Sequence, residues 1–275
     1  MHKTATIILN RNLPKVTDSL VDKILESDSE KTDIYVIEAG SDDNNLSKYT
    51  SWHVKEDDVI KNGLRYSRGM NYGLLELWKR KKWNEYDSFF LITNDTKFPD
   101  NQKTISILQD VLDTHPRIGI CSPCSKNWGE QSLIGANSLK YFWFIHNNAY
   151  IMKREFIEQV LNADSPTYMN FLFDGTNFRG YLAESEIIAK SYVNDWAAAI
   201  TTKAYAHEDE SYLLNKNHVI KTESYEINMQ LYIDEGLDWI KKKYGFNSRW
   251  QMIQYSKLMY DKFFDYFPEE SPYKI

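Results

Sequence analysis

Residues 89–99 have the sequence FFLITNDTKFP, in which an apolar run ends abruptly in Asn94, Asp95 and Thr96. A short apolar run that stops at turn formers is typical of a fully buried strand. In open α/β sheets, ligands bind outside the carboxyl ends of the strands. The stretch therefore predicts that the Asp95 carboxylate lies at the edge of a sheet, a place suited to holding a metal ion and a phosphate.

Two further buried strands are expected earlier in the chain. Residues 4–9, TATIIL, end at the polar sequence NRN of residues 10–12, and residues 33–37, DIYVI, end at EAGSDD of residues 38–43. Pro14 fits the first turn of a helix that joins them. Strand, helix and strand in succession form a βαβ unit, so the strands are expected to be parallel and the crossover right-handed. If the strands are neighbours, their polar ends converge on one edge of the sheet.

A second helix is expected to begin at SRGMNYG, residues 67–73. Glycine costs about 1 kcal/mol relative to alanine inside a helix. Gly69 and Gly73 are therefore expected where the backbone approaches a ligand closely. The other expected elements are a weak strand at 52–54, a helix through 105–112, strands at 118–121, 141–145, 149–152 and 204–206, a loop at 125–140, and helices at 154–161, 184–192 and from about 223 onward.

The composition is that of an ordinary globular protein, with 275 residues, 42% hydrophobic and 26% charged. A net charge of −6 argues against nonspecific nucleic-acid binding. No apolar run is long enough for a membrane span, and the start of the chain lacks a signal-peptide pattern, so a cytoplasmic location is expected. Cys121 and Cys124 form a lone CSPC motif, for which a structural thiol pair is favoured over redox or zinc chemistry.

The ordered set of motifs at residues 10–12, 38–43, 68–73 and 93–96 resembles the family 2 nucleotide-sugar glycosyltransferases of the GT-A fold. Each motif is loose alone, but the set in this order is specific. The resemblance covers roughly residues 4–210 and is strongest before residue 125. It implies an α/β, Rossmann-like mixed and mostly parallel sheet flanked by helices. The implied organisation is a GT-A domain at 1–222, divided into a nucleotide-binding half at 1–124 and an acceptor half at 125–222, with a C-terminal helical extension at 223–275 packed on it.

The resemblance also implies a site for a nucleotide-sugar donor, with UDP- or dTDP-linked sugars expected. Glu38 would meet the ribose or base where the family usually has Asp, and Asp95 with His207 would bind Mn²⁺ or Mg²⁺ on the diphosphate. Position 97 is Lys rather than the second acid of an Asp-x-Asp motif. The residues implied for donor binding are Asn10, Arg11, Asn12, Glu38, Gly40, Asp42, Asp43, Arg68, Gly69, Asn71, Asn94 and Asp95.

The segment YLAESEIIAK, residues 181–190, resembles the family's Glu-Asp-x-Asp motif ahead of a helix. It places Glu184 on the catalytic Asp, with Glu186 as the second candidate, whereas Ala183 replaces the first Glu. This carboxylate would take the proton of the acceptor hydroxyl in an inverting transfer. The alternative is that both glutamates are first-turn acids favoured by the helix dipole.

The expected function is therefore that of an inverting hexosyl- or deoxyhexosyltransferase acting on a saccharide or lipid-linked saccharide. By resemblance, its setting is surface polysaccharide or lipopolysaccharide synthesis, with peripheral contact at the inner face of the membrane. The changes at Ala183 and Glu184 leave open a non-catalytic nucleotide-sugar or glycan-binding module on a degenerate scaffold. A nucleotidyltransferase would need a Gly-rich loop with Arg and Lys near the first strand, and a NAD-dependent dehydrogenase would need a GxGxxG sequence after a strand. The sequence has neither, so both classes are disfavoured. The oligomeric state stays open.

Overall fold

The computed structural model describes residues 3–125, 130–145, 149–209 and 211–275. Its strands are β1 (Thr4–Asn10), β2 (Thr32–Ala39), β3 (Thr50–Val54), β4 (Ser88–Thr93), β5 (Thr96–Lys97), β6 (Ile118–Ser125), β7 (Leu139–Tyr141), β8 (Ala149–Lys153) and β9 (Ala197–Glu208). Its helices are α1 (Pro14–Asp28), α2 (Asp57–Asn62), α3 (Arg65–Lys79), α4 (Thr104–Thr114), α5 (Glu130–Ile134), α6 (Arg154–Val160), α7 (Ala183–Val193), α8 (Ser211–Lys216), α9 (Tyr225–Tyr244) and α10 (Arg249–Tyr266), with 3-10 helices η1 (Trp83–Glu85) and η2 (Pro268–Tyr273).

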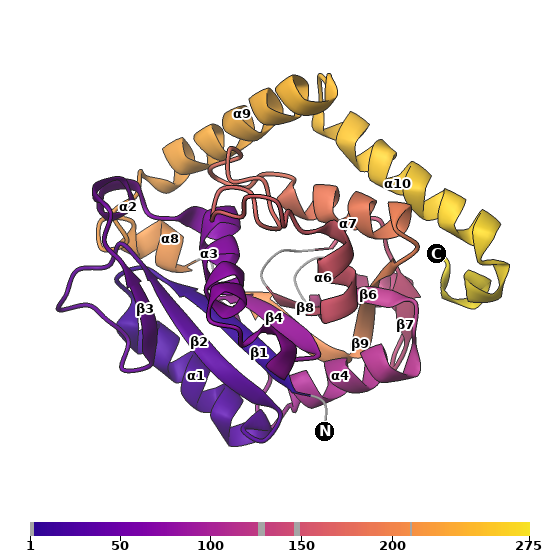
Figure 1. Ribbon diagram of the computed structural model, residues 1–275, viewed down its shortest axis with the longest axis horizontal. Helices are drawn as coiled ribbons and strands as arrows, with labels where there is room; N and C mark the ends of the chain where they lie inside the picture. Colours follow the sequence, from indigo (N-terminus) through magenta and orange to yellow (C-terminus); the bar gives the residue numbers. More distant parts are fainter. Residues whose placement is uncertain (1–2, 126–129, 146–148, 210) are drawn as a thin grey trace.

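The strands form one mixed sheet in the order β3-β2-β1-β4-β8-β6-β9-β5, and β7 pairs with β9 (Figure 1). Strand β1 lies between β2 and β4 and is parallel to both. The carboxyl ends of these three strands therefore meet at one edge, as predicted. Beyond β4 the sheet is mixed, because β8 runs antiparallel to both β4 and β6. The predicted α/β class, a sheet flanked by helices, is confirmed.

Helices α1 and α4 lie side by side over one face of the sheet, and α3, α6 and α7 cover the other (Figure 1). A Cβ added at Gly69 would lie 2.4 Å from Leu9 Cδ1, and one at Gly73 would lie 2.7 Å from Ile37 Cδ1. The glycines thus allow α3 to pack tightly on β1 and β2. The close approach seen here is between helix and sheet, while a donor-binding role for Gly69 stays a prediction.

Two predicted strands differ in extent from the structure. The strand expected at 204–206 is the end of β9, whose first residues, Ala197 to Ala199, carry little strand propensity. The strand expected at 141–145 ends at Tyr141, although Phe142 N still donates to Ala198 O at 2.8 Å. The loop expected at 125–140 contains α5 and the start of β7. Residues 146–148, where the strands expected at 141–145 and 149–152 were to meet, lie outside the described residues.

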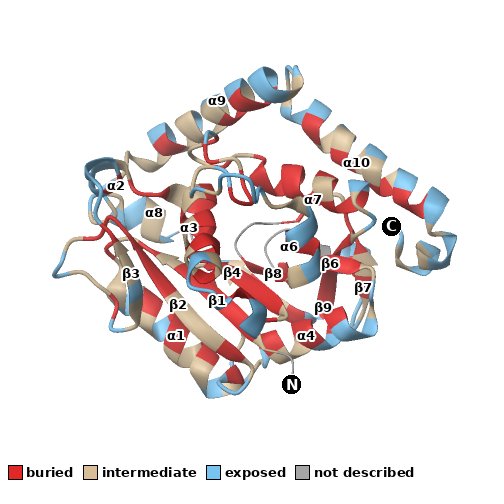
Figure 2. Ribbon diagram, viewed as in Figure 1, coloured by how far each residue is buried: buried red, intermediate tan, exposed pale blue. Residues whose placement is uncertain are grey.

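The C-terminal helices pack on the start of α7. Ser256 Oγ of α10 donates to Ser185 O at 2.9 Å, and Leu182 packs in a buried cluster with Trp239 and Met252. Figure 2 shows buried and exposed residues alternating along α9 and α10, as expected of helices with one packed face. The boundary predicted at residue 222 stays a prediction. None of the helices in the described ranges is both long and apolar enough to cross a membrane.

Both cysteines lie in β6 as buried free thiols. Burial raises the pKa of the Cys121 thiol. Because the thiolate is the reactive form, this environment favours a structural role for the thiol pair.

Asp28 at the end of α1 caps the N-terminus of α4. Its buried carboxylate accepts from Ile105 N at 3.0 Å and from Ser106 N at 3.1 Å. We expect Asp28→Ala to lower the free energy of unfolding by about 2 kcal/mol, because it leaves two helix-terminal amides without an acceptor. Denaturant unfolding measures this, with Asp110→Ala on the exposed face of α4 as control. Equal midpoints for the two variants would contradict the capping role.

Candidate active site

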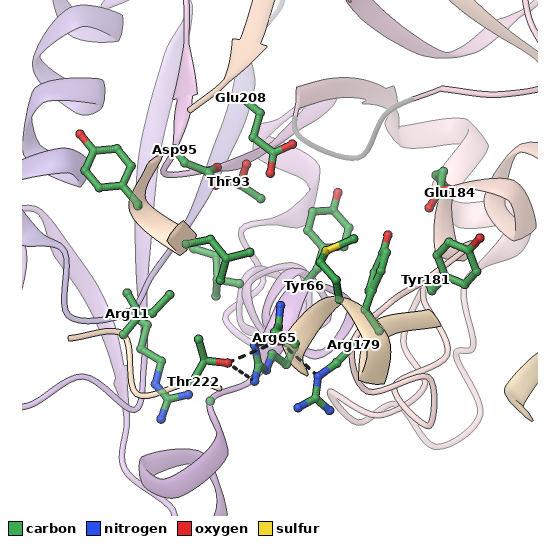
Figure 3. A pocket seen from close by; sticks show the side chains of 18 of the residues that line it. Arg11, Arg65, Tyr66, Thr93, Asp95, Arg179, Tyr181, Glu184, Glu208 and Thr222 are labelled. Atoms are coloured by element: carbon green, nitrogen blue, oxygen red, sulfur yellow. Dashed lines mark hydrogen bonds between the residues drawn. The ribbon is translucent and has the colours of Figure 1, made fainter. Parts of the chain in front are cut away.

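A cavity of about 740 Å³ opens at the carboxyl edge of β1 and β4. Its walls come from the ends of β1, β4 and β9, the first residues of α3 and α7, and helices α8, α9 and α10 (Figure 3). Five residues predicted for the site line it: Asn10, Arg11, Asn94, Asp95 and Glu184.

Asp95 and Glu208 bring two carboxylates to the same wall of the cavity, beside Thr93 (Figure 3). Strand β5 pairs with β9 so that Thr96 lies opposite Glu208, and Asp209 N holds Asp95 O at 3.0 Å. Carboxylate oxygens are the hard ligands that Mg²⁺ prefers. Within the described ranges, no cluster of three or more His, Cys, Asp or Glu side chains is placed to hold a metal.

Glu208 was not predicted as a site residue; the metal ligand predicted from the sequence is the adjacent His207. Successive side chains of a strand point to opposite faces. His207 lies opposite Lys97 in the ladder and does not line the cavity, whereas Glu208 does. The available signal for a metal ligand was the acidic pair Glu208 and Asp209 directly after His207.

Glu184 lies in the first turn of α7 and faces the cavity (Figure 3). Its side chain is buried, and its Oε2 has no hydrogen-bond partner among the described residues. Burial raises the pKa of its carboxyl from the ordinary value of 4.5 to about 7. A carboxylate with a raised pKa and an unused oxygen in a cavity is suited to general-base chemistry near neutral pH.

Glu186, the second candidate base, is engaged elsewhere. Its Oε1 accepts from the hydroxyl of Tyr244 and lies 2.7 Å from Lys243 Nζ, and the side chain does not line the cavity. Residues two apart on a helix face different directions, so only one of the two glutamates can point into the cavity. The geometry therefore favours Glu184.

Glu38 holds the loops that follow β1 and β2. Its carboxylate is fully buried and accepts from Asn10 Nδ2 at 2.9 Å, Ser41 Oγ at 2.6 Å, Ser47 N at 2.8 Å and Thr50 Oγ1 at 3.0 Å. It does not line the cavity. A direct contact with the base or ribose stays a prediction, whereas the loop-holding role is what these bonds show.

Arg68 and Asn71 of α3 hold the segment that precedes α7. Asn71 is fully buried, and its amide bonds to the backbone of Tyr168, Leu172 and Phe173 at 2.8–3.0 Å. Arg68 Nε donates to Gly175 O at 2.8 Å. Neither side chain lines the cavity, so both are placed to position its wall. Their predicted contacts with the donor stay predictions.

The remaining predicted residues join the loops at the cavity edge. Asn12 accepts from Asp42 N and donates to Val219 O, both at 2.8 Å. Asp42 pairs with Lys221 at 2.5 Å, and Asp43 pairs with Lys55 at 2.5 Å. Asn94 Nδ2 donates to Asn10 Oδ1 at 2.9 Å.

Gly40, in the loop after β2, is required to be glycine. Its φ is +76°, and a Cβ there would lie 2.1 Å from Val59 O.

The helices after β9 add an aromatic wall that was not expected from the sequence. Tyr212 of α8, Tyr225 and Tyr232 of α9 and Trp250 of α10 line the cavity. The sequence predicts helices from about residue 223 onward, but it predicts neither α8 nor which face the later helices turn toward the site. The only available signal was the aromatic content of 15%.

No protein-family model matches this chain, and no curated protein matches it by sequence. Solved structures match it by fold. The mannosyltransferase PcManGT from Pyrobaculum calidifontis, in complex with GDP-Man and Mn²⁺, is 11% identical with a TM-score of 0.52, covering 94% of this chain and 73% of that chain. TarS from S. aureus, residues 1–349 in complex with UDP, is 11% identical with a TM-score of 0.51, covering 87% of this chain and 72% of that chain. The chain therefore has a fold similar to those of these solved structures.

Proposed function

We propose that the protein is a GT-A glycosyltransferase of the family 2 type, which transfers a sugar from a nucleoside-diphosphate donor. The observation that carries this is the buried Glu184, which lines the same cavity as Asp95 and Glu208. Structures of similar fold are a mannosyltransferase with GDP-Man and Mn²⁺ and a protein with UDP. A saccharide or lipid-linked saccharide acceptor, and a setting in surface polysaccharide or lipopolysaccharide synthesis at the inner face of the membrane, belong to the same proposal.

In this proposal the nucleoside lies against the end of β1, near Leu9 and Arg11, and the diphosphate lies beside Asp95. Both regions line one continuous cavity. UDP- and dTDP-linked donors are the proposed ones.

Asp95 and Glu208 would hold Mn²⁺ or Mg²⁺, with phosphate and water oxygens completing the coordination. The fit rests on two carboxylates that line one wall of the cavity. His207 would not be a metal ligand, because its side chain lies on the face of β9 opposite to that of Glu208. When bound, such a cation neutralises charge on the departing nucleoside diphosphate.

Glu184 would take the proton of the acceptor hydroxyl. The hydroxyl oxygen forms a bond to the anomeric carbon as the bond from that carbon to the diphosphate oxygen breaks. Attack from the face opposite the leaving group inverts the anomeric configuration. The electron pair leaves with the nucleoside diphosphate, and Glu184 later returns its proton to water. A base with a pKa near the working pH is the most effective for this transfer.

Because Glu184 must be ionised to act, kcat/KM is expected to rise with pH through about 7 and then to level. The inflection is measured from initial rates of nucleoside-diphosphate release across pH 5–9, in buffers of constant ionic strength. A profile that is flat across pH 6–8 would contradict the assignment.

The raised pKa of Glu184 also predicts a stability effect. The folded-state pKa of about 7 lies above the ordinary value of 4.5, so the stability that the neutral carboxyl provides is full below about pH 4.5 and is lost as the pH rises through 7. We expect Glu184→Gln to exceed the parent in unfolding free energy by about 2–3 kcal/mol at pH 8 and by less at pH 5. Denaturant unfolding at both pH values measures this, and a variant that is less stable at pH 8 would refute it.

Calorimetric titration with UDP-, dTDP- and GDP-sugars, with and without Mn²⁺, tests the proposed function. Binding of at least one donor, strengthened by Mn²⁺, is expected, together with slow release of nucleoside diphosphate when water is the acceptor. If none of these donors binds, the proposal fails. Binding with no turnover for any saccharide acceptor would favour the non-catalytic binding module.

A further inference from the structure

The structure assigns a second anion site to this cavity, at Arg11, Arg65 and Arg179, and we propose that it binds a phosphate group of a substrate. The proposal extends the function above by naming the chemistry of a further substrate group. All three arginines line the cavity, and they gather at one end of it in Figure 3.

Three distant segments bring these guanidinium groups together. Arg11 follows β1, Arg65 begins α3, and Arg179 lies in the loop before α7. Burial, and then the charge of Arg65, lowers the pKa of Arg11 to about 10, and burial with the charge of Arg179 lowers that of Arg65. Arg11 and Arg65 still carry their charge at neutral pH. Holding like charges together in a partly buried site costs free energy, which a bound anion would offset.

The described residues offset this positive charge only in part. Arg179 pairs with Glu223 at 2.7 Å and with Glu235, and Arg65 pairs with Glu223 at 3.3 Å. Arg11 forms no salt bridge within the described ranges. Glu223 and Glu235 are thus the carboxylates paired with these guanidinium groups, while Asp42, whose charge also acts on Arg11, is itself paired with Lys221.

Arg11 and Arg65 also have hydrogen-bond donors to spare. Arg11 donates to the carbonyl oxygens of Ile60 and Lys61, both at 3.0 Å, and Arg65 donates to Thr222 Oγ1 at 2.8 Å. The Nε groups of Arg11 and Arg65 are buried without an acceptor among the described residues. The cluster thus has more donors than these residues supply acceptors.

The backbone at Arg65 adds to the positive potential. Arg65 is the first residue of α3, and the preceding Leu64 offers no side-chain cap. The N-terminus of this helix therefore adds its partial positive charge beside the arginines. Arg65 also has φ 56°, a conformation that is uncommon for residues other than glycine. The fold holds this arginine at the cavity despite the strain.

Phosphate is the chemistry that fits best. The planar fork of arginine matches phosphate oxygens, and clustered arginines favour a group with more than one negative charge. The site lies apart from Asp95 and Glu208 in Figure 3, where a cation would already serve the donor diphosphate. The phosphate at the arginines comes either from the donor or from the acceptor, and the experiment separates these sources.

Calorimetric titration of the full chain with inorganic pyrophosphate, in EDTA, tests the arginine site without metal. The parent is expected to bind pyrophosphate, and Arg65→Gln and Arg11→Gln are each expected to weaken this binding at least about tenfold. Arg80→Gln is the matched control, because Arg80 caps the other end of α3 on the surface and makes a bond to Glu76. Arg11→Gln keeps the test decisive if Arg65→Gln does not fold, since Arg11 has no salt bridge to lose within the described ranges.

Titration with the nucleoside diphosphate that the parent binds, in Mn²⁺, identifies the source. Loss of affinity for both ligands in Arg65→Gln, a residue outside the nucleoside contacts proposed above, assigns the site to a donor phosphate. Unchanged nucleotide affinity with weakened pyrophosphate binding assigns it to a phosphate on the acceptor. A parent that binds no pyrophosphate, or variants that bind it as tightly as the parent, would overturn the site. Pyrophosphate binding without any nucleotide binding would keep the arginine site and defeat the proposed function.

Discussion

Glu184→Gln is expected to lower the rate of sugar transfer by a factor of about 10²–10⁴, while nucleotide affinity stays within about twofold of the parent. Glutamine keeps the size and hydrogen-bonding shape of the side chain but cannot accept the acceptor proton. Donor binding should survive because Glu184 lies at the start of α7, in a different segment from the predicted nucleotide residues of β1 and β4. The rate is measured as nucleoside-diphosphate release with saturating donor, and affinity is measured by calorimetry.

The matched control is Glu186→Gln, two residues further along α7. Glu186 bonds to Tyr244 and Lys243 rather than facing the cavity, so its loss should weaken α9 packing and leave the transfer rate within about fivefold. Should Glu184→Gln retain full activity while Glu186→Gln loses it, the base belongs at position 186 and the cavity geometry is misleading.

Asp95→Asn is expected to lower nucleotide affinity in Mn²⁺ at least about tenfold and to remove most of the dependence on the metal. Asparagine keeps the size of the aspartate side chain but lacks the negative charge that attracts a cation. Glu208→Gln should have the same effect, because both side chains line one wall. Titrations with the nucleoside diphosphate, at zero and saturating Mn²⁺, measure the difference.

His207→Gln separates the two assignments of the second ligand. His207 does not line the cavity, so this variant should bind nucleotide and Mn²⁺ like the parent. Loss of metal dependence in His207→Gln, with Glu208→Gln unaffected, would restore the ligand pair predicted from the sequence.

The sheet edge could be predicted from the sequence because its signals are local. Apolar runs that end in Asn10 and Asn94 mark strand ends, and a helix between two such runs implies parallel pairing. These inferences need only the residues within each segment. The structure agrees, since β1 lies between β2 and β4 and is parallel to both.

The exact site residues depend on long-range contacts that no local pattern contains. Glu208 replaces His207 at the cavity because the β5–β9 pairing decides which face of β9 is turned inward. Glu38 and Asn71 have the residue types of ligand-binding groups, yet their hydrogen bonds are made to the protein's own loops. A polar residue that holds a loop and one that binds a ligand look alike until the partners are placed.

The aromatic wall and the arginine cluster illustrate the same limit. Tyr232 and Trp250 reach the cavity only because α9 and α10 fold back over it, and Arg179 approaches Arg65 across more than a hundred residues of sequence. Helix propensity predicts that such helices exist, but packing decides where they dock.

A crystal structure with a nucleoside diphosphate and Mn²⁺ would show directly whether the nucleotide, the metal and the catalytic carboxylate share one cavity. We expect the nucleobase beside the end of β1, the metal in contact with Asp95 and Glu208, and the Glu184 carboxylate facing the vacant sugar position. A nucleotide bound outside this cavity would contradict the proposed function. So would a nucleotide whose diphosphate directs its sugar-bearing end away from Glu184.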